Sequence, residues 1–111
     1  MEFTAVPVVT TSSEHGEGAL WDDLTQRLLW VDINGCKVNV FDPATEKNQS
    51  GPTGSPIGTV VPTRVPTRVA AALQDGFATV DLQSGAVEYL ARMDLGGPRF
   101  NDGKADPGGR F

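Results

Sequence analysis

An internal repeat of about 40 residues constrains the fold of this chain more than any other sequence feature. Arg27-Leu28 aligns with Arg68-Val69 at a shift of 41 residues. Phe41-Asp42 aligns with Val80-Asp81 at a shift of 39 residues. Arg110-Phe111 lies 42 residues beyond Arg68-Val69 and belongs to a third copy. A period near 40 with four short strands in each copy is typical of β-propeller blades. A generic antiparallel sandwich explains the strands but not the period.

Each copy consists of short apolar runs separated by turn residues, and this pattern predicts an all-β chain. The 13 Gly and 8 Pro are spread over the whole length, and no stretch shows helical periodicity. Asn34-Gly35 separates two apolar runs and predicts a type I′ hairpin turn, which needs positive φ at both central residues. The predicted strands after the first span residues 27–33, 37–42, 46–50, 57–62, 68–74, 77–82 and 86–92.

These strands predict a partial propeller over residues 1–111, with four antiparallel strands per blade. The first blade covers about 14–51, the second about 57–92, and a third begins at about 98–111. A tandem Pro-Thr-Arg-Val repeat occupies residues 62–69. Because Pro donates no backbone hydrogen bond, we expect this loop to bulge outward, and no function follows from it. The expected core residues are Leu29, Trp30, Val31, Val38, Val40, Ala70, Ala72, Val80 and Tyr89.

Charge and cysteine content argue against several classes of function. The formal net charge is −5, and no cluster of Lys or Arg occurs, so we expect no nucleic-acid partner. Cys36 is the only cysteine, which excludes an internal disulfide and a thiolate metal cluster. No apolar run approaches the roughly 18 residues of a membrane helix, and the first 11 residues do not resemble a signal peptide. We therefore expect a cytoplasmic chain without a membrane partner.

Two segments carry polar groups suited to chemistry. In the first, Glu17 lies between Gly16 and Gly18 just before an apolar strand, and the glycines let a ligand approach closely. The second, residues 99–104, is dense in hydrogen-bonding groups. Because each segment begins the innermost strand of its blade, we expect Glu17 and Asn101 to face one central cavity, although 84 positions separate them.

Simpler interpretations of both segments stay open at this point. A lone Glu beside glycines is more often a solvated turn residue than a metal ligand, and Asn-Asp-Gly favours tight turns by itself. The familiar catalytic motifs do not fit. His15 is the only histidine and has no partner serine in an elbow motif. The sequence around Glu17 lacks the third glycine of a dinucleotide fingerprint.

The two polar segments and the apolar runs between them resemble the regucalcin (senescence marker)/gluconolactonase family. The resemblance implies a six-bladed propeller with one divalent metal, calcium or zinc, in its channel, and hydrolysis of sugar lactones. Glu17 matches the family's first metal ligand, while Arg99 and Asn101 match positions that hydrogen-bond the sugar substrate. The matching segments are residues 16–21, 27–33, 41–43, 99–104, 106–107 and 109–111.

The resemblance also limits what these 111 residues can do by themselves. The family's other metal ligands, an Asn and an Asp, and a further substrate-binding Glu come from later blades. That Asp is also the expected general base, so no catalytic residue is assigned here. We expect the N-terminal part of a metal-dependent sugar lactone hydrolase, which alone holds its metal weakly and is inactive. The alternative is a non-catalytic module that binds or self-assembles through exposed blade edges.

Overall fold

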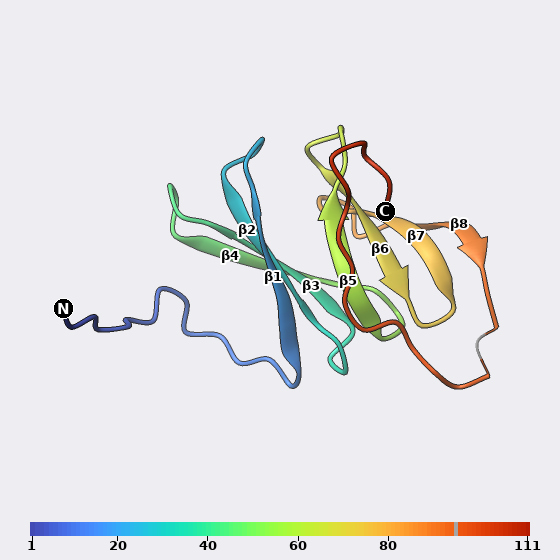
Figure 1. Ribbon diagram of the computed structural model, residues 1–111, viewed down its shortest axis with the longest axis horizontal. Coiled ribbons are helices and arrows are strands. Elements are labelled where there is room, and N and C mark those ends of the chain that lie inside the picture. Colours follow the sequence, from blue (N-terminus) through green and yellow to red (C-terminus); the bar gives the residue numbers. More distant parts are fainter. Residues whose placement is uncertain (95) are drawn as a thin grey trace.

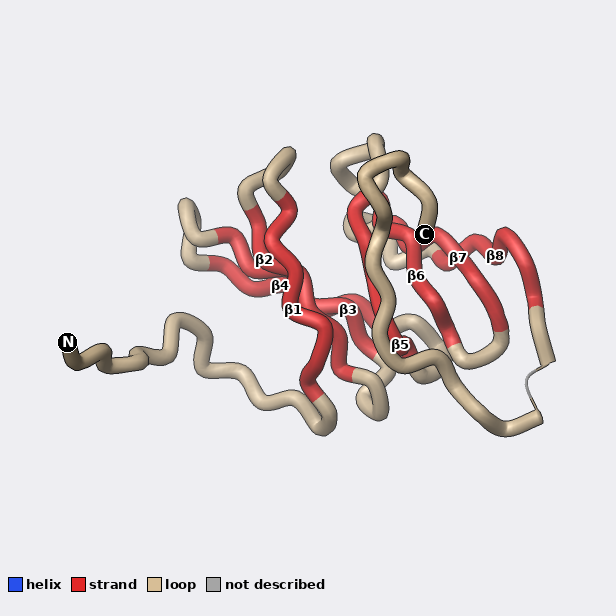
Figure 2. The backbone as a smooth tube through the Cα atoms, in the orientation of Figure 1, coloured by secondary structure: helices blue, strands red, loops and turns tan. Residues whose placement is uncertain are grey.

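The computed structural model describes residues 1–94 and 96–111, which form two four-stranded antiparallel sheets (Figure 1). The first sheet has the order β1-β2-β3-β4 and the second β5-β6-β7-β8, so consecutive strands pair within each sheet. None of the described residues is helical, so none belongs to a helix that is long and apolar enough to cross a membrane (Figure 2). The strands are β1 (Gly16–Asp22), β2 (Arg27–Asp32), β3 (Lys37–Asp42), β4 (Lys47–Pro52), β5 (Ile57–Pro62), β6 (Arg68–Leu73), β7 (Gly76–Asp81) and β8 (Val87–Arg92).

The hydrophobic core lies between the two sheets, where β2 and β3 contact β5. The predicted core is confirmed for Leu29, Val31, Val38, Val40, Ala72 and Val80, all of which are buried, and Tyr89 packs half-buried against them. The prediction is wrong for Trp30 and Ala70, which are only half-buried. Successive side chains of a strand point to opposite faces of the sheet. Trp30 therefore points away from the core that its neighbours Leu29 and Val31 enter.

The β2–β3 hairpin is not the predicted type I′ turn. Neither Asn34 nor Gly35 has positive φ, and the left-handed residue is Cys36, with φ 56°. The Cys36 N–H donates to the Ile33 carbonyl at 3.3 Å, and the Gly35 N–H donates to the Asp32 carboxylate at 2.9 Å. The Asp32 side chain thus closes a longer, four-residue loop, and side-chain acceptors of this kind compete with the backbone geometry that Asn-Gly favours by itself.

The segment of residues 98–111 runs alongside β5, but it is not a strand (Figure 1). The Thr59 hydroxyl of β5 donates to the Gly103 carbonyl at 3.0 Å. The Phe77 ring packs against Phe100 and Phe111, with ring centroids 5.0 and 6.1 Å apart. The prediction of an innermost strand at residues 99–104 is therefore wrong for this chain. The segment is held by side-chain packing and single hydrogen bonds, whereas a strand requires a ladder with a neighbour.

The tandem tetrapeptide spans the end of β5, the loop of residues 63–67 and the start of β6. The Thr63 hydroxyl donates to the Arg68 carbonyl at 3.0 Å, and the Arg68 N–H donates to the Val65 carbonyl at 2.9 Å. Arg64 and Val65 are exposed at the tip of the loop. The loop is thus closed by its own hydrogen bonds and projects into solvent instead of forming a tight turn.

Asp75, in the β6–β7 turn, ties the outermost strand β8 to the rest of its sheet. Its carboxylate accepts hydrogen bonds from the Tyr89 hydroxyl at 2.6 Å, from Arg92 at 3.1 Å and from Ser55 at 3.4 Å. The Arg92 guanidinium also lies 3.9 Å from the centre of the Tyr89 ring. The Tyr89 hydroxyl is the largest of the influences that lower the pKa of Asp75 below its ordinary value of 3.8.

This lowered pKa predicts a specific pH dependence for Tyr89→Phe. The carboxylate of Asp75 stabilises the fold above pH 3.8, and this contribution is lost as the pH falls through the folded-state pKa. Removing the hydroxyl raises that pKa towards its ordinary value. The loss of unfolding free energy caused by Tyr89→Phe should therefore be larger at about pH 6 than at about pH 2, as measured by urea denaturation. An equal loss at both pH values would contradict the assignment.

Candidate functional site

Glu17 lies near the start of β1, directly before an irregularity of the strand. It pairs with Val31 of β2, whereas the next paired residue of β1 is Leu20. The bulge between them contains Gly18 and Ala19, and Gly18 has φ 66°, a left-handed conformation that favours glycine. The bulge interrupts the ladder immediately after Glu17, and bulges of this kind re-aim side chains next to functional sites.

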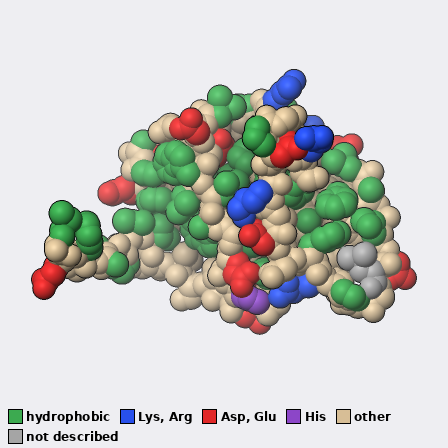
Figure 3. All heavy atoms as spheres, viewed as in Figure 1, with side chains coloured by type: hydrophobic (Ala, Val, Ile, Leu, Met, Phe, Trp, Pro, Cys, Tyr) green, Lys and Arg blue, Asp and Glu red, His purple; other side chains and the backbone are tan. Residues whose placement is uncertain are grey.

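Glu17 is exposed, and it is one of the residues that line an open groove beside β1. The His15 Nε2 atom lies 3.1 Å from Glu17 Oε1. Figure 3 shows this only histidine of the chain, in purple, at the surface beside acidic side chains. The apolar walls of the groove come from Val8, Val9, Leu28 and Trp30. Trp30, which was expected in the core, therefore lines the groove that Glu17 borders.

Asp32 holds the residues that lead into β1, and sequence reasoning missed this role. Its side chain is buried, with 5 % exposure, and accepts N–H groups from Glu14 at 2.8 Å, His15 at 2.9 Å and Gly35 at 2.9 Å. Burial by itself raises the pKa of Asp32, but the three N–H donors and Lys37 together lower it below its ordinary value. An Asp near the end of an apolar strand, two residues before Asn34-Gly35, was the sequence signal for this clamp.

Arg99 and Asn101 lie in the segment beside β5. Arg99 is half-buried, and its Nη1 atom donates to the Phe100 carbonyl at 3.1 Å. Asn101 is exposed, and its backbone carbonyl lies close to Gly58, where an added Cβ would be 3.0 Å from the oxygen. The backbone of the Phe100 residue approaches Gly58 even more closely. Glycine at position 58 therefore lets this segment pack directly against β5.

β5 is the shared neighbour of the two predicted site segments. It contacts β1, which carries Glu17, and it also contacts the segment that carries Arg99 and Asn101 (Figure 1). The groove beside Glu17 is lined by residues of the first sheet and of the N-terminal arm, without Arg99 or Asn101. A single cavity shared by Glu17 and Asn101 thus stays a prediction.

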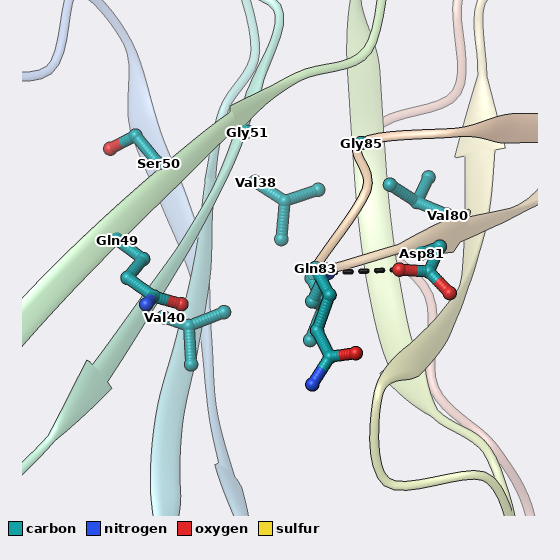
Figure 4. A pocket seen from close by; sticks show the side chains of 10 residues that line it. Val38, Val40, Gln49, Ser50, Gly51, Val80, Asp81, Gln83 and Gly85 are labelled. Carbon is teal, nitrogen blue, oxygen red and sulfur yellow. Dashed lines mark hydrogen bonds between the residues drawn. The ribbon is translucent and has the colours of Figure 1, made fainter.

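The cleft between the two sheets contains none of the predicted site residues (Figure 4). Val38 of β3 and Val80 of β7 line it from opposite sheets. The Asp81 carboxylate accepts N–H groups from Ser84 at 2.8 Å and from Gln83 at 2.9 Å, which lower its pKa. Asp81 therefore stabilises its own hairpin turn, and the rest of the cleft is lined by valine, leucine and glycine residues together with the uncharged polar residues Gln49, Ser50 and Gln83.

The donor set at Glu17 fits a divalent metal only in part. A hard cation such as calcium takes six or more oxygen ligands, and the nearest partner of Glu17 is the His15 ring. Within residues 1–94 and 96–111, no three His, Cys, Asp or Glu residues are grouped so that they could hold a metal ion. Glu17 as a metal ligand therefore stays a prediction.

Comparison with known proteins gives consistent matches over nearly the whole chain. Residues 15–111 match the profile of the SMP-30/Gluconolactonase/LRE-like region. Regucalcin of Xenopus laevis is 41% identical over 110 residues, which cover 94% of this chain and 35% of regucalcin. Pentonolactonase XacC of Haloferax volcanii is 33% identical over 108 residues, which cover 97% of this chain and 36% of that enzyme. The chain thus spans about a third of the length of these relatives.

A solved structure shows the same fold. A calcium-binding regucalcin from Agrobacterium tumefaciens superposes with a TM-score of 0.82 at 22% sequence identity. The superposition covers 92% of this chain and 35% of that protein. The two sheets are therefore two blades of a β-propeller, as the repeat near 40 residues predicts.

Proposed function

We propose, since the chain belongs to the SMP-30/gluconolactonase/LRE-like family, that it serves in the metal-dependent hydrolysis of sugar lactones. The observation that carries this proposal is the match over residues 15–111, which includes an exposed Glu17 at the start of β1. One relative is named a pentonolactonase, and one similar structure is described as calcium-binding. Both descriptions support a lactone substrate and a calcium-like ion for this chain.

Glu17 is the residue that would hold the metal. Its carboxylate oxygens are the ligand type that hard divalent cations prefer, and the groove beside it is open to solvent. A bound divalent cation supplies polarisation of the lactone carbonyl and activation of a water molecule. The protein fixes the backbone on both sides of Glu17. The Asp32 carboxylate binds the N–H groups of Glu14 and His15, which precede Glu17, and the Gly18 bulge follows Glu17.

Arg99 and Asn101 would bind and orient the sugar. Arg presents a planar fork of N–H donors, and Asn presents both donors and an acceptor, which suits the hydroxyl groups of a sugar. The Asn101 amide is exposed, and its backbone is packed at Gly58, so its side chain projects from an anchored segment. Such anchoring reduces the entropy lost when a substrate binds.

Calcium titration of Glu17→Gln tests the metal site. With one carboxylate ligand, the chain should bind calcium with a dissociation constant of roughly 1 mM or weaker. Glu17→Gln should abolish this binding, because the substitution removes the charged ligand and keeps the side-chain shape. Binding is followed through the carboxylate carbon signals in NMR spectra. Glu14→Gln, which removes a nearby carboxylate outside the groove, serves as the matched control.

Two outcomes of this titration would speak against Glu17 as a ligand. Unchanged calcium binding in Glu17→Gln would exclude the metal site proposed here. Equal losses in Glu17→Gln and Glu14→Gln would indicate a diffuse attraction of calcium to an acidic surface, since the chain carries a formal net charge of −5.

A further inference from the structure

The hydrogen bonds of Asp32 differ in kind from those of the other hairpin aspartates. Asp22 accepts the Leu24 N–H at 3.1 Å, and Asp42 accepts the Ala44 N–H at 2.9 Å, so each closes the loop that follows it. Asp32 closes its own loop through Gly35 in the same way. Its other two N–H donors belong to residues that precede it by 17 and 18 positions. Asp32 therefore joins two distant parts of the chain.

The residues that Asp32 holds lie immediately before the proposed metal ligand. Its two distant donors are the N–H groups of Glu14 and His15, and the His15 carbonyl accepts the Ile33 N–H at 3.0 Å. Glu17 follows His15 by two residues, and the β1–β2 ladder shifts register directly after Glu17. Glu17 thus sits on a short paired stretch between the Asp32 clamp and the bulge, so the clamp contributes much of what fixes its backbone.

The β2–β3 loop is shaped around the same carboxylate. A Cβ added to Gly35 would collide with the Asp32 side chain, at 2.5 Å from Cγ. Asp32 is 5 % exposed. Its hydrogen bonds to Gly35 and to the residues before β1 leave its carboxylate little freedom to move. Gly35 therefore contributes to the same arrangement, because it leaves room for the Asp32 carboxylate that holds the residues before β1.

We propose that Asp32 is a positioning residue for Glu17: its buried carboxylate fixes the backbone before β1 and thereby sets where the Glu17 carboxylate is presented. This inference rests on the proposed function, in which Glu17 holds the metal. Residues that hold a metal ligand in place without binding the metal commonly set the orientation of that ligand. Their loss typically lowers metal affinity about 10- to 100-fold.

Calcium titration of the 111-residue chain tests the inference with matched variants. Asp32→Asn should weaken calcium binding about tenfold, at the low end of the range for residues behind a metal ligand. Asp22→Asn should leave it unchanged, although it also removes a buried carboxylate that caps a hairpin of β1. Without metal, amide hydrogen exchange at Glu14 and His15 should accelerate in Asp32→Asn and not in Asp22→Asn.

A second variant covers the case in which Asp32→Asn does not fold. Gly35→Ala retains the carboxylate but displaces it, and it should weaken calcium binding in the same direction by a smaller factor. Equal weakening by Asp22→Asn and Asp32→Asn would overturn the inference, because general destabilisation would then explain both. Unchanged binding in Asp32→Asn, together with loss in Glu17→Gln, would overturn the positioning role alone. Unchanged binding in Glu17→Gln would overturn the proposed function and the positioning role together.

Discussion

Leu29→Ala is expected to lower the free energy of unfolding by about 2–5 kcal/mol, the usual range for removing a buried leucine side chain. Leu29 is only 2 % exposed and belongs to the cluster that joins the two sheets. Its loss leaves a cavity at the interface between β2 and the second sheet. The matched control is Leu90→Ala on β8, where the side chain is 66 % exposed and the loss should stay within about 0.5 kcal/mol.

This difference is large relative to the stability that a chain of this size can have. Domains of 111 residues typically unfold with about 5–15 kcal/mol, so Leu29→Ala removes a major share. Urea denaturation measures both variants, and the slope of free energy against urea should stay the same if both remain two-state. Similar losses for Leu29→Ala and Leu90→Ala would show that the two sheets do not pack in solution as they do in this structure.

No appreciable hydrolysis of gluconolactone is expected from the 111-residue chain, whereas a version extended to the length of its relatives should be active. The chain spans about a third of those relatives, and Glu17 is the one metal ligand proposed for it. The resemblance places the general base and the other ligands in later blades. A positioned base and a substrate clamp each contribute large rate factors, so their absence should abolish turnover.

The extended version is made by joining this chain to the remaining two thirds of a full-length relative such as the regucalcin of Xenopus laevis, and hydrolysis of gluconolactone is followed by acid release at constant pH. Glu17→Ala in that version should lower kcat/KM by more than the roughly 10- to 100-fold that loss of a residue behind a metal ligand costs. Arg99→Ala should mainly raise KM, because it removes the proposed contact to the sugar. Clear turnover by the 111-residue chain that disappears in Glu17→Ala would contradict the expectation and indicate a site completed by a second copy.

Local sequence patterns predicted the eight strands of the two sheets in their order, together with a further strand at residues 99–104 that the structure does not form. Alternating apolar residues defined residues 37–42, and the repeat of the same pattern defined residues 57–62, with the bounds that β3 and β5 have in the structure. The internal repeat led to two four-stranded units, because each unit needs the same run of strands and turns to bury one face. Glu17 was recognisable as a candidate ligand for a local reason as well, since it stands between two glycines at the start of an apolar strand.

Contacts between distant segments decided the remaining features, and no local pattern contains them. Both faces of β2 are apolar, so only the packing of the second sheet determined that Leu29 enters the core while Trp30 lines the groove beside Glu17. Asn34-Gly35 favours a type I′ turn by itself, but the Asp32 carboxylate imposes another loop and also holds the residues before β1. A buried carboxylate is stable only with several donors around it, and tertiary structure alone brings donors together from positions that are far apart in the chain.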